Sequence, residues 1–286
     1  MKKFVSLLIM ALVLQAGVYL YLDRVVLVPQ VSFTEKTVPG TAKADQLGSY
    51  SSDRAYYAQL SPTGLKIFST SDNLLSQEIT LQPNQTITYF SWLANHHLAL
   101  AGISTDTDQG TSVALKPINL ETGSKPVIPT ITGLQRGARI ADVALSQETN
   151  VVNILVRNNT TATVYRTDAN NRLRRLNLKT SDIRRIATLH NTVDLFYESP
   201  AGGVVYALDS AGRTRRISPP GSKYSLIGVD GSDRVYIGQL NSSNKVSVLM
   251  VGDAGGHFRN FANLSQPYSP DAITIGNDGR PTFGST

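Results

Sequence analysis

Residues 224–240 read YSLIGVDGSDRVYIGQL. Two short runs of apolar and aromatic residues flank the turn-forming segment Asp230-Gly-Ser-Asp233, and this arrangement is typical of two β-strands joined by a tight turn. No stretch beyond residue 49 shows a convincing helical period; its apolar residues alternate or form short runs. We therefore expect an antiparallel strand pair here, within a domain that is almost wholly β.

The same strand-turn-strand pattern recurs at a spacing of roughly 35–55 residues, which is the range typical of propellers and other repeat arrays. We take the first unit to begin at Ala55, with an inner strand, a turn at residues 61–64 and a second strand. The other units are ITYFSWLANHHLALAGI from Ile87, ADVALSQETNVVNILVR from Ala141, RRIATLHNTVDLFYESP from Arg184 and DAITIGNDGRPTFGS from Asp271.

Each unit is followed, where the chain continues, by a further hairpin with a polar turn. Residues 204–212, VVYALDSAG, show this most clearly, with Asp209 and Gly212 in the turn. Asp, Asn and Gly tolerate the backbone conformations of tight turns, so a third strand should end there and an outermost strand should follow. The repeat therefore predicts four strands in each unit.

The pattern resembles the β-propeller superfamily, and is closest in style to the six-bladed TolB-like and WD40-like propellers. The resemblance covers about residues 50–286 and rests on the repeated hairpins with turns such as Leu208-Asp-Ser-Ala-Gly212. The Trp-Asp dipeptides of true WD40 repeats are absent, and Trp92 is the only Trp, so the resemblance implies an architecture and transfers no functional residue. We expect six four-stranded blades; five or seven blades and a two-sheet sandwich are the alternatives.

The last unit, from Asp271, has only enough residues for half a blade. Closing a propeller removes the exposed strand edges that an open sheet would leave. We therefore expect a strand near Val31–Thr34, or the stretch around Gln46–Ser52, to complete this blade.

An uncharged stretch from Phe4 to Leu22 follows Lys2 and Lys3 and ends at Asp23-Arg24. It lies within the roughly 17–25 residues that span a bilayer as a helix, and no small-x-small cleavage site follows it closely. The flanking charges predict a cytoplasmic N-terminus. We predict a tail over 1–3, a transmembrane signal-anchor helix over 4–24, a linker over 25–49 and an extracellular propeller over 50–286. The alternative is a cleaved signal peptide, which would make the protein secreted.

The composition fits an exported globular domain, with 41% hydrophobic and 17% charged residues and no Cys. Without Cys there is no disulfide framework and no lipidation through sulfur, which favours a bacterial surface protein over a eukaryotic secreted one.

Basic residues are concentrated between Tyr165 and Arg216, where ten Lys and Arg face five acids, and this excess accounts for nearly all of the formal charge of +6. They predict an anion-binding surface for lipid head groups, a teichoic-acid-like polymer or an acidic protein. The alternative is solvated charge that blunts sheet edges. We do not expect nucleic-acid binding, because no stacking aromatics are interleaved. The candidate residues are Arg172, Arg174, Arg175, Arg184, Arg185, Arg213, Arg215 and Arg216.

No catalytic, cofactor or metal motif is recognisable in the sequence. His96 and His97 should point to opposite faces if they lie in a strand, and the segment 106–110 lacks the later ligands of a calcium loop. We predict no catalytic, cofactor-binding or metal-binding residue. Two function classes follow: a membrane-tethered binding or scaffold module with a protein partner in a cell-surface or envelope complex, and a propeller enzyme, a lyase or glycan hydrolase, with its active site on the central axis.

Overall fold

The computed structural model describes Gln15 and residues 48–93, 97–121, 128–159, 161–168 and 170–284. The chain divides into two compact units, 1–34 and 35–286. Gln15 is helical and is the one described residue of the first unit. The rest of the predicted anchor and the candidate closing strand Val31–Thr34 lie outside the described residues. Within the described ranges, no helix is long and apolar enough to cross a membrane.

The second unit is built from β-sheets, and each sheet consists of consecutive strands paired antiparallel. The first three sheets contain β1 (Ser49–Tyr50), β2 (Tyr56–Ser61), β3 (Gly64–Ser69) and β4 (Leu75–Thr80); β5 (Gln85–Trp92), β6 (Leu98–Thr107), β7 (Gly110–Asn119) and β8 (Ile131–Leu134); and β9 (Arg139–Ser146), β10 (Val151–Arg157), β11 (Ala162–Thr167) and β12 (Leu173–Arg175).

The fourth and fifth sheets also have four strands, and the last described sheet has two. They contain β13 (Ile186–Thr188), β14 (Leu195–Ser199), β15 (Val204–Leu208) and β16 (Thr214–Arg216); β17 (Tyr224–Val229), β18 (Val235–Leu240), β19 (Val246–Gly252) and β20 (Arg259–Tyr268); and β21 (Ile273–Ile275) and β22 (Pro281–Phe283), which follow the short 3-10 helix η2 (Pro270–Ala272). The prediction of an all-β domain with four strands in a unit is confirmed for five units.

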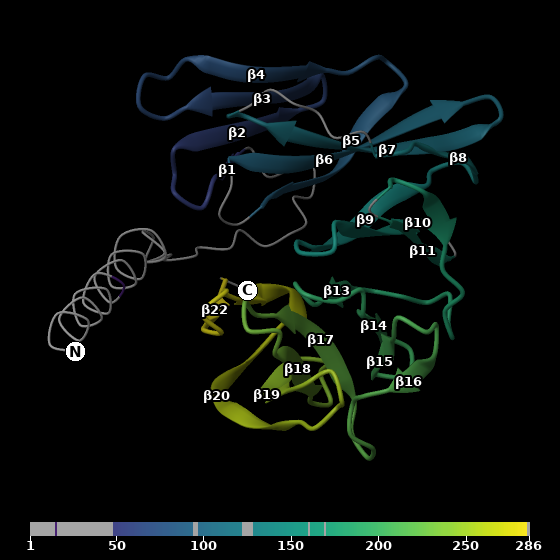
Figure 1. The fold of residues 1–286 in the computed structure, drawn as a ribbon, viewed down its shortest axis with the longest axis vertical. Helices are drawn as coiled ribbons and strands as arrows, with labels where there is room; N and C mark the ends of the chain where they lie inside the picture. Colours follow the sequence, from purple (N-terminus) through teal and green to yellow (C-terminus); the bar gives the residue numbers. More distant parts are fainter. Residues whose placement is uncertain are drawn as a thin grey trace, which may run out of the picture. The chain divides into compact units, whose positions relative to one another are not determined.

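Each sheet lies beside the next one along the chain (Figure 1). The first strands contact one another in succession, β5 with β9, β9 with β13, β13 with β17 and β17 with β21, so they are the innermost strands. The last strand of each four-stranded sheet is correspondingly the outermost.

The first sheet corrects the predicted start of the repeat. β1 pairs with β2, with Ser49 opposite Ala58 and Tyr50 opposite Tyr57. The innermost strand is therefore β1, and the stretch from Ala55 contributes the second and third strands, one strand later than predicted. The described part of 46–52 belongs to this sheet and does not pair with β21 or β22. A two-residue strand carries no apolar run, which is why the pattern began at Ala55.

The core is a series of apolar layers between consecutive sheets. In β10 the neighbours Ile154 and Leu155 are both buried, Ile154 against the second sheet and Leu155 against the fourth. Because successive side chains of a strand point to opposite faces, a sheet enclosed on both faces needs a nearly continuous apolar run. This requirement accounts for the sequence VVNILVR of β10.

Side chains of one sheet bind the backbone of the next sheet's innermost strand. Such a strand has no further strand on its inner side, so its N–H groups need other acceptors. The acceptors come each time from the preceding sheet: Thr88 Oγ1 for the N–H of Ile140 at 3.2 Å, Asp142 Oδ2 for Ile186 at 3.0 Å and Glu198 Oε2 for Leu226 at 3.1 Å.

In this arrangement the carboxyl of Asp142 loses hydration. Burial raises the pKa of its carboxyl to about 6, although the N–H groups of Ile186 and Val143 and the charges of Arg185 and Arg157 act in the opposite direction. The carboxylate is therefore held on the inner strand against an unfavourable loss of hydration.

The first prediction concerns the pH dependence of stability. Because the pKa of Asp142 is higher in the folded than in the unfolded chain, the folded protein binds more protons between about pH 4 and 6, and the free energy of unfolding should decrease as pH rises through this window. Asp142→Asn should remove up to about 3 kcal/mol of that decrease. Denaturant unfolding at each pH measures the free energy of unfolding. Asp108→Asn, on an exposed turn, is the control. If the free energy of unfolding decreases equally steeply with pH in wild type and in Asp142→Asn, the raised pKa of Asp142 is contradicted.

Two glycines begin third strands at points where the outermost strand approaches closely. Gly64 and Gly110 have positive φ angles of 153° and 130°. A Cβ added at Gly64 would overlap the carbonyl oxygen of Ile79, and one at Gly110 would overlap that of Leu134. Neither backbone carbonyl can move away without disturbing its strand pairing.

The second prediction follows from this overlap. Gly110→Ala should destabilise the protein by roughly 2–4 kcal/mol, because the new Cβ meets a backbone oxygen in a strained conformation. Gly202→Ala is the control, since a Cβ added at Gly202 would lie 3.3 Å from its nearest neighbour, Val204 Cγ2. Thermal unfolding should show a clearly lower Tm for the first variant alone; similar Tm values would show that β7 and β8 can separate at no cost.

Candidate functional site

The connection between the third and fourth sheets is the most distinctive loop of the described domain. It runs from 176 to 185, whereas the other described connections between sheets cover 81–84, 135–138, 217–223 and 269–272. It is three residues longer than the next longest of these. Loops held by a rigid scaffold are where binding groups are most often found, which makes this segment the first candidate for a binding site.

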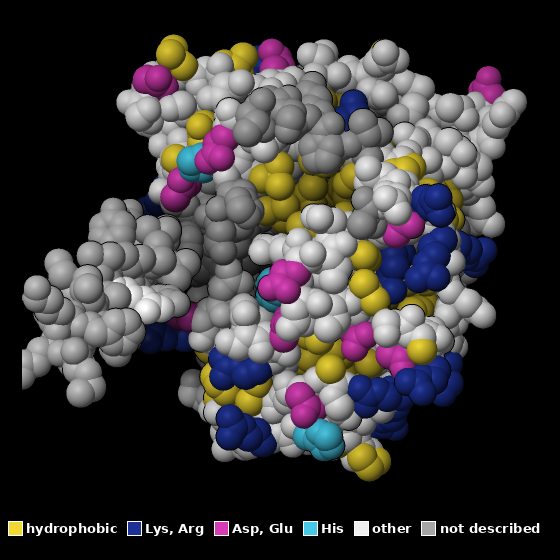
Figure 2. Space-filling view, in the orientation of Figure 1, with side chains coloured by type: hydrophobic (Ala, Val, Ile, Leu, Met, Phe, Trp, Pro, Cys, Tyr) yellow, Lys and Arg dark blue, Asp and Glu magenta, His cyan; other side chains and the backbone are white. Residues whose placement is uncertain are grey.

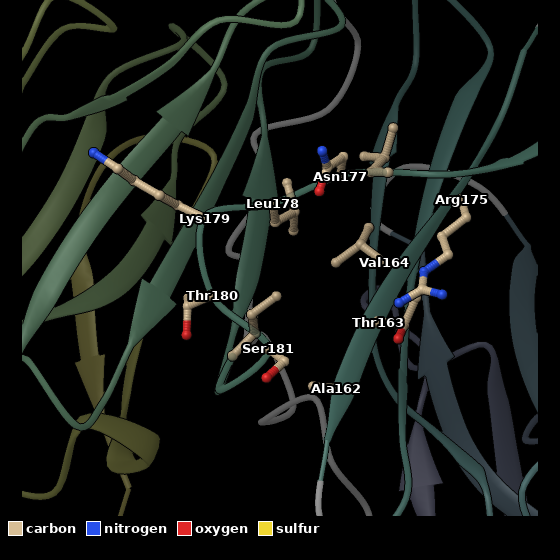
Figure 3. A pocket seen from close by; sticks show the side chains of 11 residues that line it. Ala162, Thr163, Val164, Arg175, Asn177, Leu178, Lys179, Thr180 and Ser181 are labelled. Carbon is tan, nitrogen blue, oxygen red and sulfur yellow. The ribbon is translucent and has the colours of Figure 1, made fainter.

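Two backbone hydrogen bonds hold the connection against the free edge of β11. The N–H of Leu176 donates to Val164 O, and the N–H of Ala162 donates to Ser181 O, both at 2.8 Å. Between these bonds the chain leaves β11 and a pocket of about 430 Å³ opens (Figure 3). Its lining residues are Ala162, Thr163, Val164, Arg175, Leu176, Asn177, Leu178, Lys179, Thr180, Ser181 and Ile183.

A second pocket of about 340 Å³ adjoins the first and shares Ala162 and Ser181 with it. Its other lining residues are Arg157, Asn158, Asn159, Thr161, Asp182, Arg184 and Pro200. We call the two pockets together the β11 groove. Its charged lining residues are four cations, Arg157, Arg175, Lys179 and Arg184, and one acid, Asp182.

The fourth sheet shows what the third would look like without the groove. Arg175 lies opposite Tyr165 as Arg216 lies opposite Tyr206, so Ser218 corresponds to Asn177. In the fourth sheet the Ser218 hydroxyl accepts the N–H of Val205 at 3.2 Å.

In the third sheet the corresponding N–H belongs to Val164. The N–H and C=O of one strand residue point to the same side. Since Leu176 binds the Val164 carbonyl on this side, the Val164 N–H faces the pocket. No described side chain accepts it, and it is therefore a donor available to a ligand.

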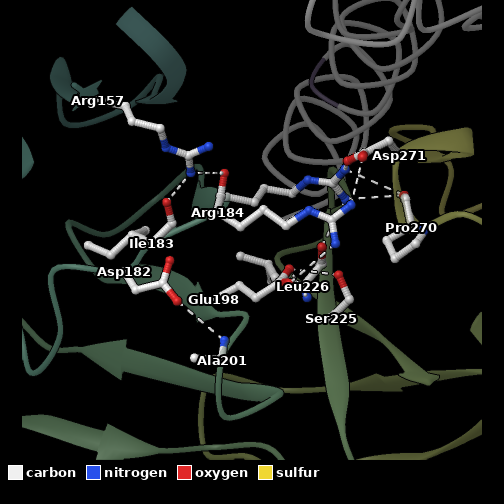
Figure 4. Close-up of polar contacts among 11 residues, drawn as sticks. Arg157, Asp182, Ile183, Arg184, Glu198, Ala201, Ser225, Leu226, Pro270 and Asp271 are labelled. Atoms are coloured by element: carbon white, nitrogen blue, oxygen red, sulfur yellow. Dashed lines mark hydrogen bonds and ion pairs between the residues drawn. The ribbon is translucent and has the colours of Figure 1, made fainter. Parts of the chain in front are cut away.

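Arg184 and Arg185 end the connection and form an ion-paired cluster at its inner end (Figure 4). Arg184 Nη2 lies 2.6 Å from Asp271 Oδ2, and Arg185 Nη2 lies 2.6 Å from Asp271 Oδ1. Partial burial acts to raise the pKa of Asp271, but the two guanidinium groups bring this pKa below its usual range. Asp271 belongs to η2, so the cluster joins the last sheet to the connection.

Glu198 is the buried acid of this cluster. Its Oε2 accepts hydrogen bonds from Ser225 Oγ at 2.6 Å and from the N–H of Leu226 at 3.1 Å, and Arg184 Nη1 lies 3.7 Å from Oε1. Burial outweighs these partners and raises its pKa. Glu198 thus ties the fourth sheet to the fifth and presents no open face to a substrate.

The eight predicted arginines fall into two groups. Arg184 and Arg185 belong to the ion-paired cluster, away from the outer strands. The other six are exposed on, or directly before, the outermost strands β12 and β16, and we call them the arginine edge. Figure 2 shows Lys and Arg side chains gathered along this side. The arginine edge consists of Arg172, Arg174, Arg175, Arg213, Arg215 and Arg216.

The two strands of the arginine edge differ in their partners. On β16, Arg213 pairs with Asp209 at 2.9 Å, Arg215 donates to the carbonyls of Ala254 and Gly255, and Arg216 donates to those of Ser218 and Pro219. Around β12, the guanidinium groups of Arg172, Arg174 and Arg175 form no ion pair with a described carboxylate, although Asp168 Oδ1 accepts the backbone N–H of Arg172 at 2.8 Å. The uncompensated charge therefore lies beside the β11 groove.

Arg166, which lies between Asn153 and Arg174 in the strand register, is not part of this surface. It is buried, its Nε donates to Asn153 Oδ1 at 2.8 Å, and burial lowers its pKa to about 10.

The histidines do not converge on a metal site in the described ranges. His97 has Asp53 at 2.7 Å from Nε2 and Glu121 at 2.9 Å from Nδ1, and carboxylates on opposite ring nitrogens cannot share one ion. His96 lies outside the described residues. His190 and His257 each contact one carboxylate, of Asp233 and Asp253. In the part of the chain that the structure describes, no group of three or more His, Asp or Glu residues is arranged to hold a metal.

Sequence reasoning missed the β11 groove and the acids that bind inner strands. The available signal was the ten-residue interval between β12 and β13, which is long for a link between consecutive units. Asp271 and Glu198 gave no signal, because their partners lie far away in the sequence.

The chain matches no protein-family model and no curated protein. Among solved structures it is similar to TolB from Acinetobacter baumannii, with a TM-score of 0.51 and 17% identity, over 84% of this chain and 55% of TolB. A catalytically inactive virginiamycin B lyase from Staphylococcus aureus gives a TM-score of 0.52 and 11% identity, over 83% of this chain and 77% of the lyase.

A prolyl endopeptidase structure gives a TM-score of 0.53 and 14% identity, over 84% of this chain and 40% of the endopeptidase. The chain thus spans about half of TolB and less than half of the endopeptidase. At these identities the likeness concerns the fold. The chain has a β-propeller fold, as its repeat pattern predicted.

Proposed function

We propose that this protein is a membrane-anchored extracytoplasmic β-propeller that acts as a binding or scaffold module in a cell-surface or envelope complex. The apolar stretch 4–22 supports the anchor, and the five four-stranded sheets with the β21–β22 pair support six blades. The binding face in this proposal is the β11 groove together with the arginines around β12, Arg172, Arg174 and Arg175.

The observation that carries the proposal is the position of the uncompensated charge. Arg172, Arg174 and Arg175 are exposed, their guanidinium groups form no ion pair among the described residues, and they border a polar groove made by the longest described connection between sheets. Charge that only blunts a sheet edge needs no pocket beside it. An open pocket with convergent donors is what a binding site provides.

The acids near the groove argue against the enzyme alternative. A general base must be free to approach the proton it removes. Glu198 is closed off by Ser225 and Leu226, and Asp271 is held by Arg184 and Arg185. Asp182 is exposed and accepts the N–H of Ala201 at 3.3 Å. Two of the structures of similar fold are enzymes by name, so the fold itself does not decide between the classes.

Site-specific photo-cross-linking tests the binding face. A photoreactive amino acid at Thr163, inside the groove of the full-length chain, should capture a specific partner in native membranes, whereas the same group at Ser76 on β4 should not. Adding Arg174→Ser and Arg175→Ser should lower the yield by about tenfold, because charge-assisted hydrogen bonds are lost. Equal capture from Ser76 and Thr163, or a yield that both substitutions leave unchanged, would refute the proposal.

Membrane fractionation tests the anchor separately. The full-length chain should stay in the membrane fraction through a high-salt wash, since a spanning helix does not depend on screened surface charge. Protease added outside intact cells should degrade the propeller. Release by salt, or full protection in intact cells that is lost on lysis, would contradict the proposed topology.

A further inference from the structure

We infer that the β11 groove binds a polyol-phosphate polymer, with Arg175 and the Val164 N–H receiving one phosphate group. The inference rests on the proposed function and names the ligand class of the same site. It depends on the donors inside the groove, on the chemistry of its walls and on the part of β11 that is already occupied.

The donors of the groove suit a tetrahedral anion. Figure 3 shows the guanidinium of Arg175 beside Thr163, on the strand that also presents the Val164 N–H to the pocket. Arg175 and Thr163 both line the first pocket, and among the described residues the Arg175 guanidinium forms no ion pair and the Thr163 hydroxyl no side-chain hydrogen bond. A guanidinium, a hydroxyl and a backbone N–H on one wall form a donor set that phosphate oxygens accept.

The walls suit a hydroxylated chain rather than a flat ring. No aromatic side chain lines either pocket, so neither bases nor sugar rings find a stacking platform. The nearby aromatic contacts are internal: Lys179 Nζ lies 5.6 Å from the centre of the Tyr206 ring, and the Lys179 N–H donates to the Tyr197 hydroxyl at 3.2 Å. Hydroxyl and amide groups, from Thr163, Asn177 and Ser181, line the first pocket.

The length of the groove favours a polymer over a single anion. The two pockets share Ala162 and Ser181, and each has an arginine, Arg175 in one and Arg157, which donates to the carbonyls of Ile183 and Arg184, in the other. Arg172 and Arg174 continue the positive charge beyond the groove. A chain with regularly spaced phosphates would meet several of these groups at once and gain avidity.

An acidic peptide fits the groove less well. Peptides commonly bind a sheet by adding a strand to a free edge. Here the edge of β11 is already taken at both ends of the pocket, by Leu176 at Val164 and by Ser181 at Ala162. An extended peptide would therefore find no ladder to join.

The test measures binding of the full-length chain in nanodiscs of neutral lipid to a fluorescent poly(glycerol phosphate) oligomer by anisotropy at fixed ionic strength. Arg175→Gln should weaken binding about tenfold, because a charge-assisted bidentate contact is lost. Arg175→Lys should give an intermediate value, since it keeps the charge without the planar fork. The matched control is Arg216→Gln, at the same register position of the fourth sheet outside the groove, and it should change binding by less than about twofold.

Three outcomes would overturn the inference. Equal losses from Arg175→Gln and Arg216→Gln would indicate attraction to the whole basic edge. Inorganic phosphate that competes as well as the oligomer would indicate a single-anion site. Polyglutamate that binds as tightly as the oligomer would indicate an acidic-peptide site.

The proposed function is judged by a different readout. If the oligomer fails to bind but capture at Thr163 in native membranes is retained, the polymer ligand is wrong and the proposed binding module still holds. If the oligomer binds but nothing is captured at Thr163, the polymer ligand still holds and the proposed role in an envelope complex is contradicted. Matching Tm values for wild type and variants would confirm that the exposed substitutions leave the fold intact.

Discussion

Burial of both faces of every internal sheet is the constraint on which this structure depends. Ile154 and Leu155, neighbours in β10, enter different apolar layers, and each layer needs the next sheet for its other half. Hydrophobic burial is the main favourable term in folding, so no sheet of this kind would be stable alone.

The innermost strands determine where the acids of the domain are used. Their inward N–H groups need acceptors, and Asp142 and Glu198 supply them at the expense of hydration, as their raised pKa values show. Asp271 is used in a similar way by Arg184 and Arg185. Asp142, Glu198 and Asp271 thus serve the inner part of the domain while the arginine edge stays exposed, which explains how a modest net charge of +6 produces a strongly basic edge.

The sequence predicted what depends on local chemistry and missed what depends on distant partners. Turns such as 209–213, where Asp209 Oδ1 accepts the N–H of Arg213, follow from residue type, and they correctly separated third from outermost strands. β1 was not predicted, because two residues are too few to show an apolar pattern. Arg184 and Arg175 look alike in the sequence, yet one pairs with Asp271 and the other borders the groove, and only the three-dimensional path of the connection separates them.

The matched arginine strands β12 and β16 have a practical consequence. Their hairpins are built alike, and the difference between a grooved and an ungrooved edge comes from the connection that follows, 176–185 in one sheet and 217–223 in the other. The groove is therefore a property of a linker, while folding is a property of the strands. A protein engineer who wished to move or duplicate the groove would lengthen residues 217–223 and leave the repeat untouched.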